Sequence, residues 1–158
     1  MDREAFAEMD CPIARSLAVI GEWWTPLILR DIYAGLTRFD AIHANLGVSR
    51  KVLSQRLATL TEHGVIERVP YQDNPPRYDY RLTTKGLELG AVLLAMKSWG
   101  DRWTAGAGDG APGTWLRHER CGSITEPILT CSSCGEPLAP QEVTLLPAEE
   151  AEQAAAPR

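Results

Sequence analysis

Three cysteines and one histidine in the C-terminal part of the chain have the spacing of metal ligands. Two residues separate His118 from Cys121, two separate Cys131 from Cys134, and nine lie between the pairs. Thiolate sulfur and imidazole nitrogen are the ligands that zinc prefers in tetrahedral structural sites. The four residues therefore predict a structural zinc site. A reducible Cys131–Cys134 pair, or two turns that no longer bind metal, are the alternatives.

The segment around these residues predicts a small module that depends on its metal. Gly122 and Gly135 directly follow the second ligand of each pair, where glycine lets the backbone turn its N–H groups toward sulfur. Residues 115–145 are too few to bury enough apolar surface to fold alone, so the metal would supply stability. Because the pattern resembles a zinc-ribbon knuckle, we expect a zinc-ribbon-like module.

A second set of polar residues has the spacing of a helix that contacts DNA. Lys51 and Gln55 are four residues apart and lie opposite an apolar face of the helix. Lysine can donate to guanine O6 and N7 or to a phosphate, and glutamine can pair with adenine through two hydrogen bonds. We therefore predict that this helix, residues 49–63, reads bases. Its apolar face consists of Leu53, Leu57 and Leu60.

Five further residues complete the predicted DNA-binding surface. Ser49 is expected to cap the helix, Arg50 lies in its first turn, and Ser54 lies beside the reading face. Arg56 projects to the side, where either a phosphate or an intramolecular partner is expected. Arg77 lies near the tip of a predicted hairpin, within reach of a phosphate or the minor groove.

The elements around the reading helix predict a mainly α fold with a small β-hairpin wing. A short apolar helix, a turn containing Gly47 and a capped longer helix form a helix-turn-helix. Val48 of that turn is expected in the core. The elements expected around this motif are helices over 11–21, 25–35 and 38–46, strands over 65–70 and 77–82 with a loop over 71–76, and a long apolar helix from Thr83 to about Trp103.

The start of the second helix carries two tryptophans. Trp23 and Trp24 are expected to be core aromatics, and a role in a ligand pocket is the alternative. Thr25 is expected to cap the helix, and Pro26 suits its first turn.

Length, charge and hydropathy limit the classes of protein. No apolar run approaches the roughly 18 residues of a membrane span, and the acidic N-terminus lacks a secretory core. We therefore expect a cytoplasmic protein with reduced thiols and no membrane partner. The net charge is −5, yet residues 38–85 hold eight Lys and Arg against five Asp and Glu. That excess suits DNA binding, with ordinary solvated surface as the alternative.

Composition divides the chain into four parts. A Gly/Ala-rich segment separates a large apolar domain from the module with the predicted ligands. The parts are a winged helix-turn-helix DNA-binding and dimerisation domain over 10–103, a flexible linker over 104–114, the zinc-ribbon-like module over 115–145 and a disordered tail over 146–158.

Several motifs resemble those of the HxlR-type winged helix-turn-helix transcriptional regulators of bacteria, within the MarR-like superfamily. The resemblance covers roughly residues 10–103 and leaves the zinc-ribbon-like module outside as an extension. The motifs are Cys11-Pro12-Ile13, Gly21-Glu22-Trp23-Trp24-Thr25-Pro26-Leu27-Ile28-Leu29-Arg30-Asp31, Arg38-Phe39-Asp40-Ala41-Ile42, Leu46-Gly47-Val48-Ser49, Leu53-Ser54-Gln55-Arg56-Leu57, Pro75-Pro76-Arg77 and Tyr80-Arg81-Leu82-Thr83.

The resemblance implies a sequence-specific transcriptional regulator without enzymatic activity. It implies a homodimer, joined through its first and last helices, on a pseudo-palindromic double-stranded DNA operator, with a small molecule or an oxidant as effector. Some members use a cysteine near the position of Cys11 as a thiol sensor; a plain helix-start residue at the dimer contact is the alternative. Two other functions stay open: a thiol/redox protein using Cys131 and Cys134, and a winged-helix protein-interaction adaptor.

Overall fold

The computed structural model of the chain describes residues 3–104, 114–147 and 150. The chain divides into two units, Met1–Lys97 and Ser98–Arg158. This division falls inside the last long helix, upstream of the predicted linker. Residues 105–113 of that linker lie outside the described residues, as do residues 148–149 and 151–158 of the predicted tail.

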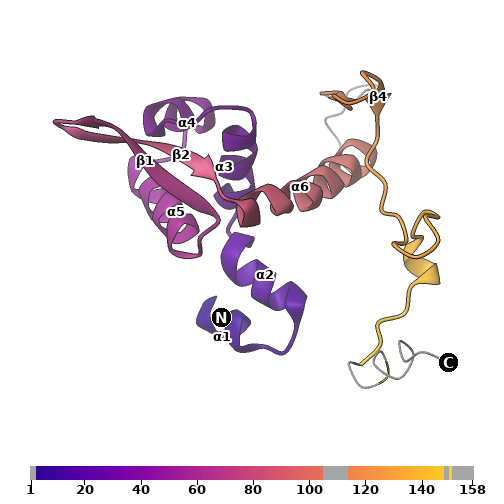
Figure 1. Cartoon of the computed structure of the whole chain (residues 1–158). Coiled ribbons are helices and arrows are strands. Elements are labelled where there is room, and N and C mark those ends of the chain that lie inside the picture. Colours follow the sequence, from indigo (N-terminus) through magenta and orange to yellow (C-terminus); the bar gives the residue numbers. More distant parts are fainter. Residues whose placement is uncertain (1–2, 105–113, 148–149, 151–158) are drawn as a thin grey trace. The chain divides into compact units, whose positions relative to one another are not determined.

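The first unit has the winged helix-turn-helix architecture that the sequence predicts (Figure 1). Helices form the body, and one antiparallel hairpin extends away from them. Its elements are α1 (Arg3–Glu8), α2 (Pro12–Ile20), α3 (Trp24–Tyr33), α4 (Phe39–Leu46), α5 (Arg50–Glu62), β1 (Ile66–Asp73), β2 (Pro76–Leu82) and α6 (Thr84–Trp103), which continues into the second unit.

One apolar core joins α3, α4 and α5 to the start of the hairpin. Helices α3 and α5 each contribute residues three or four positions apart, the spacing of a single helical face, and α4 contributes Ile42. The first strand contributes Ile66, directly after Val65. The buried residues of this core are Ile28, Leu29, Ile32, Ile42, Val48, Leu53, Leu57, Leu60, Val65 and Ile66.

Helix α6 begins at the predicted cap. The Gly86 N–H donates to the Thr83 hydroxyl at 3.1 Å, and Leu89 and Leu93 pack against the core of the first unit. Other apolar residues of α6 remain exposed, among them Met96. Neither α6 nor any other helix of the described residues is long and apolar enough to cross a membrane.

The start of α3 differs from the prediction. The helix begins at Trp24, and Thr25 is buried inside it, so Thr25 is not its cap. Trp23 is 90% exposed and Trp24 37% exposed, so the prediction of two core aromatics is wrong. Pro26 permits the earlier start, because N–H groups in the first turn of a helix have no intrahelical acceptor to lose.

The hairpin is longer than predicted. Residues 71–73, expected in a loop, belong to β1, and the turn is reduced to Asn74 and Pro75. Strand pairing uses backbone groups, so the polar residues here pair as well as apolar ones would. A bulge between Pro70 and Gln72 adjusts the register. The Gln72 side-chain amide donates to the carbonyls of Asn74 and Pro75 at 3.2 and 3.0 Å and holds the tip together.

The second unit contains little regular structure beyond the end of α6. Strand β3 (Leu116–Arg117) pairs with β4 (Ile124–Thr125), and a 3-10 turn, η2, covers Pro140–Glu142. Residues 114–147 include no buried residue. This segment therefore has no apolar core of its own.

Candidate nucleic-acid interface

The turn between α4 and α5 fixes where the predicted reading helix begins. Gly47 has a φ of 64°, in the left-handed region that glycine adopts at little cost. Val48 then enters the core, and the Ser49 hydroxyl accepts the Val52 N–H at 3.3 Å. The predicted turn glycine, core valine and helix cap are confirmed.

Helix α5 has an apolar face and a polar face. Its three leucines are buried, whereas Lys51, Ser54 and Gln55 are exposed. Within the described part of the chain, neither Lys51 nor Gln55 has a hydrogen bond or ion pair through its side chain. Their donors are thus available to an external acceptor.

Two arginines of α5 have partners within the protein. The Arg50 guanidinium lies 2.7 Å from the Asp40 carboxylate and 5.3 Å from the centre of the Phe39 ring. The Arg56 guanidinium lies 3.3 Å from the Glu22 carboxylate, and its side chain is only 13% exposed. For Arg56, the structure favours the intramolecular alternative over a phosphate contact.

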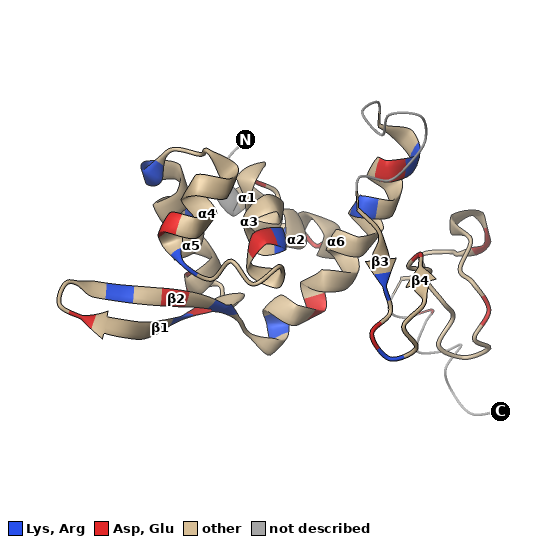
Figure 2. Ribbon diagram, turned by 90° about the horizontal axis from the view of Figure 1, so that it is seen from above, with Lys and Arg blue, Asp and Glu red and all other residues tan. Residues whose placement is uncertain are grey.

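The hairpin carries three arginines and three acidic residues along its two strands (Figure 2). Arg77, beside the tip, is exposed and pairs across the strands with Gln72. Arg38 stacks on the Tyr71 ring at 4.5 Å and lies 3.5 Å from the Asp79 carboxylate. These contacts tie the hairpin to the start of α4, so the wing and the helix-turn-helix are held together.

A buried carboxylate, which the sequence analysis did not single out, joins α3 to α4. Asp31 is 2% exposed, and its carboxylate accepts from the Arg30 guanidinium at 2.7 Å and from the Asn45 side-chain amide at 2.9 Å. The only sequence signal was a charged residue inside the apolar stretch of α3. Asp31 therefore positions the two helices that precede the reading helix.

The two tryptophans that lie outside the core line a groove beside α5. The groove has a volume of about 440 Å³. A role of Trp23 and Trp24 in a ligand pocket, the alternative to a core position, stays a hypothesis. The lining residues are Glu22, Trp23, Trp24, Leu27, Val52 and Arg56.

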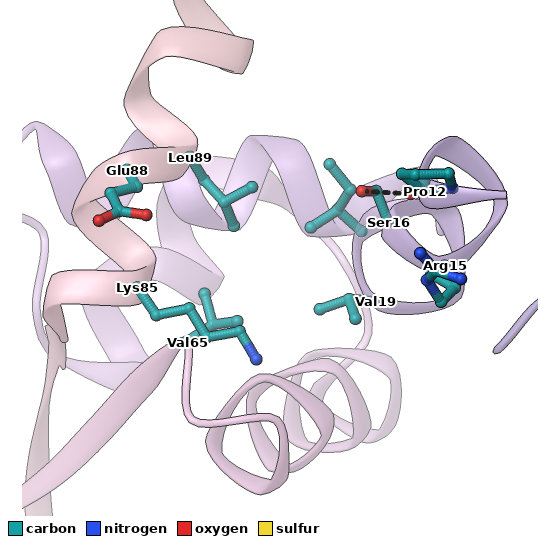
Figure 3. Close-up of a pocket in the computed structure, with 9 residues that line it drawn as sticks. Pro12, Arg15, Ser16, Val19, Val65, Lys85, Glu88 and Leu89 are labelled. Atoms are coloured by element: carbon teal, nitrogen blue, oxygen red, sulfur yellow. Dashed lines mark hydrogen bonds between the residues drawn. The ribbon is translucent and has the colours of Figure 1, made fainter. Parts of the chain in front are cut away.

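A second cavity, of about 490 Å³, lies among α2, the start of β1 and α6 (Figure 3). Arg15, Lys85 and Glu88 contribute charges to largely apolar walls, a mixture typical of sites for small amphipathic molecules. An effector stays a prediction. The remaining lining residues are Pro12, Ser16, Val19, Ile20, Val65 and Leu89.

The four cysteines occupy different environments. Cys11 is half-buried and precedes α2. Hydrogen bonds from Ser123, first its N–H and then its hydroxyl, lower the pKa of Cys121, and backbone N–H groups of Cys134 and Ser133 lower the pKa of Cys131.

The predicted metal ligands form two separate pairs. The His118 Nδ1 atom lies 3.2 Å from the Cys121 sulfur. Among the described residues, however, no three side chains of His, Cys, Asp or Glu lie close enough together to hold a metal ion. Cys131 and Cys134 lie in a turn and not at a helix start, where a thiol oxidoreductase would place them.

The profile of the HxlR-like helix-turn-helix (HTH) family matches residues 19–107. The chain belongs to this family. An uncharacterized HTH-type transcriptional regulator of Mycobacterium tuberculosis is 42% identical over 132 residues, 84% of this chain and 82% of the relative. The predicted HxlR-type family and winged-helix fold are confirmed, and the chain is a member of a DNA-binding regulator family.

Solved structures give the same fold. PA1607, described as a candidate transcription factor, is 33% identical with a TM-score of 0.78, covering 90% of this chain and 98% of its own. PA1374 from Pseudomonas aeruginosa is 37% identical with a TM-score of 0.62, covering 91% and 99%. Both alignments therefore extend beyond the residues that the HxlR-like profile matches. The reduced form of the redox regulator HypR is 29% identical with a TM-score of 0.55, covering 58% and 91%.

Proposed function

We propose that this HxlR-like protein is a homodimeric transcriptional regulator that binds a pseudo-palindromic operator, with one α5 helix in the major groove of each half-site. One observation carries the proposal: Lys51 and Gln55 are exposed on the face of α5 opposite its buried leucines. Both keep their donors uncommitted within the described residues. In the groove, Lys51 contacts guanine or a phosphate and Gln55 contacts adenine.

The wing supplies contacts to the DNA backbone. Arg77 lies beside the hairpin tip, where a basic side chain reaches a phosphate or the minor groove. Such contacts add affinity and orientation, and base specificity comes from α5.

The dimer contact lies on α2 and α6. Both helices expose apolar side chains that a monomer would leave in water. On α6, the exposed residues Val92, Met96, Trp99 and Trp103 lie three or four positions apart and so share one face of the helix. A second copy of the chain can cover this surface by symmetric packing. The exposed apolar residues of the first unit that would take part are Ile13 and Leu17 of α2 and Val92 and Met96 of α6.

Gel-shift titration with operator DNA from the promoter region of the protein's own gene tests whether Lys51 and Gln55 read bases. Lys51→Ala and Gln55→Ala should each lower the affinity of the dimer by about 30-fold or more, since each operator would lose two base contacts of about 1–3 kcal/mol each. The fold, followed by circular dichroism, should not change, because both side chains are exposed. Arg120→Ala, which removes an exposed charge from the second unit, is the control. Unchanged affinity in both α5 variants would contradict the assignment of Lys51 and Gln55 to base contacts.

Thiol-based regulation through Cys11 is a second candidate, which the likeness to the redox regulator HypR supports. A mild thiol oxidant should then weaken operator binding by the wild-type protein. Cys11→Ser should abolish that response, and a variant with serine at the other three cysteine positions should keep it. An equal response in Cys11→Ser would rule out this role.

A further inference from the structure

The second unit contains the same turn twice. In each copy the first expected ligand, His118 or Cys131, is followed three residues later by a cysteine and four residues later by a glycine. Gly122 and Gly135 have φ values of 73° and 78°. Their N–H groups donate to the carbonyls of His118 and Cys131 at 2.7 and 2.8 Å. A side chain at either glycine would be strained, so both turns require this residue.

The two turns also close in the same way. The N–H of the first ligand donates to the carbonyl five residues later: His118 to Ser123 at 2.9 Å, and Cys131 to Glu136 at 2.8 Å. Short strand pairing flanks each turn, through β3 and β4 in the first and through a bridge between Thr130 and Pro137 in the second. The two turns thus share the positions of the expected ligands, the conformation of the glycine and the closing hydrogen bonds. We would not expect this in two unrelated loops.

The first turn already has the arrangement of half a metal site. Its imidazole Nδ1 and thiol sulfur lie 3.2 Å apart. Two ligands of a tetrahedral ion are held at a comparable separation, since metal–nitrogen and metal–sulfur bonds are about 2.0 and 2.3 Å long. The second turn places Cys131 and Cys134 in the equivalent positions.

The segment that carries the turns has no buried apolar core to stabilise it. Residues 114–147 include no buried residue, and apolar side chains such as Ile128 and Leu129 are about two-thirds exposed. Residues 126–129 connect the first paired segment to the second. A metal ion that binds both turns would close this segment and supply the folding energy that burial does not.

We propose that the two turns are preformed halves of one zinc site, completed when a single ion binds His118, Cys121, Cys131 and Cys134 of the same chain. The ion would be four-coordinate, with three thiolates and one imidazole, a ligand set that fills a structural site and leaves no open position. Among the described residues, the two pairs do not lie close enough together to share one ion. Zinc therefore brings the two turns together, and its binding releases the thiol protons.

Metal content of the full-length protein, purified under reduction and reconstituted with zinc, tests this proposal. We expect one zinc per chain by elemental analysis. We expect cobalt substitution to give the thiolate-to-metal absorption of a tetrahedral site. The double variant Cys131→Ser/Cys134→Ser should lose both signals, and Cys11→Ser should keep them. Zinc well below one per chain in the wild type, or one zinc retained in the double variant, would overturn the proposal.

Mixing two variants tests whether one chain supplies all four ligands. His118→Ala/Cys121→Ser and Cys131→Ser/Cys134→Ser each lack one turn, and a mixture of the two should bind no more zinc than either alone. Recovery of zinc binding in the mixture would show ligands shared between two chains and would overturn the single-chain site. Operator affinity, measured on the same samples, reports separately on the function proposed for α5.

Discussion

Asp31 is a charged residue inside the core of the helix-turn-helix. Its carboxylate accepts hydrogen bonds from Arg30 on its own helix and from Asn45 on α4. A buried carboxylate is tolerated only where such donors replace water. The residue therefore fixes the relative position of α3 and α4, and through the Gly47 turn it fixes where α5 begins.

We predict that Asp31→Ala destabilises the domain. The loss should be about 1.5–3 kcal/mol in the free energy of unfolding, the usual contribution of hydrogen bonds to a charged group. Urea denaturation measures it. Asp40→Ala is the matched control, because its ion pair with Arg50 is exposed and should contribute less than about 1 kcal/mol. Equal losses in the two variants would contradict a special role for Asp31.

At the scale of elements, the approach of α6 to the hairpin depends on one glycine. A Cβ atom at Gly86 would lie 2.1 Å from the Val65 carbonyl oxygen, a backbone atom that cannot move aside alone. The helix can therefore pack here only because this residue has no side chain.

Substitution of Gly86 should separate packing from helix propensity. Gly86→Ala should destabilise the protein by about 1–3 kcal/mol, as overpacking does. Gly100→Ala, in the same helix with nothing closer than 4.0 Å, should stabilise it by about 0.5–1 kcal/mol. Thermal and urea unfolding measure the stability of both variants. A stabilised Gly86→Ala variant would contradict the packing argument.

The contribution of the wing to DNA binding can be measured separately from that of α5. Arg77→Ala should weaken binding to specific and unrelated DNA by similar factors, because a phosphate contact carries no sequence information. It should reduce the slope of log affinity against log salt by about 2, because the dimer loses one phosphate contact from each wing. Arg68→Ala is the control, because it removes the same charge from β1, where the guanidinium stacks on the Tyr78 ring at 4.9 Å. A loss confined to the specific operator would assign Arg77 to base reading instead.

At the scale of the whole molecule, the proposed dimer predicts a coupling between assembly and DNA binding. Met96→Glu should raise the dimer dissociation constant by about 10- to 100-fold, since burial of one methionine contributes about 1.5–3 kcal/mol. Operator affinity should fall with it, because two linked half-sites gain from effective concentration. Sedimentation and gel shifts measure the two effects. Ala91→Glu places the same charge outside this face of α6 as the control, and an unchanged dimer in Met96→Glu would exclude this contact.

The sequence by itself determined the features that depend on near neighbours in the chain. The apolar spacing of α5, the Ser49 cap and the left-handed Gly47 are local, because helix faces and caps involve residues within four positions of each other. The same holds for the two turns of the second unit, whose proposed ligands and glycines lie within five residues. These features could be predicted, and with them the family.

Only the tertiary structure decided features that depend on residues far apart in the chain. It placed Trp23 outside the core, paired Arg56 with Glu22, and buried Asp31 against Asn45. It also lengthened the hairpin, since strand pairing is set by the opposite strand and not by local composition. Whether a polar or aromatic side chain faces core, partner or solvent depends on contacts between distant segments, and apolar spacing along one helix carries no information about them.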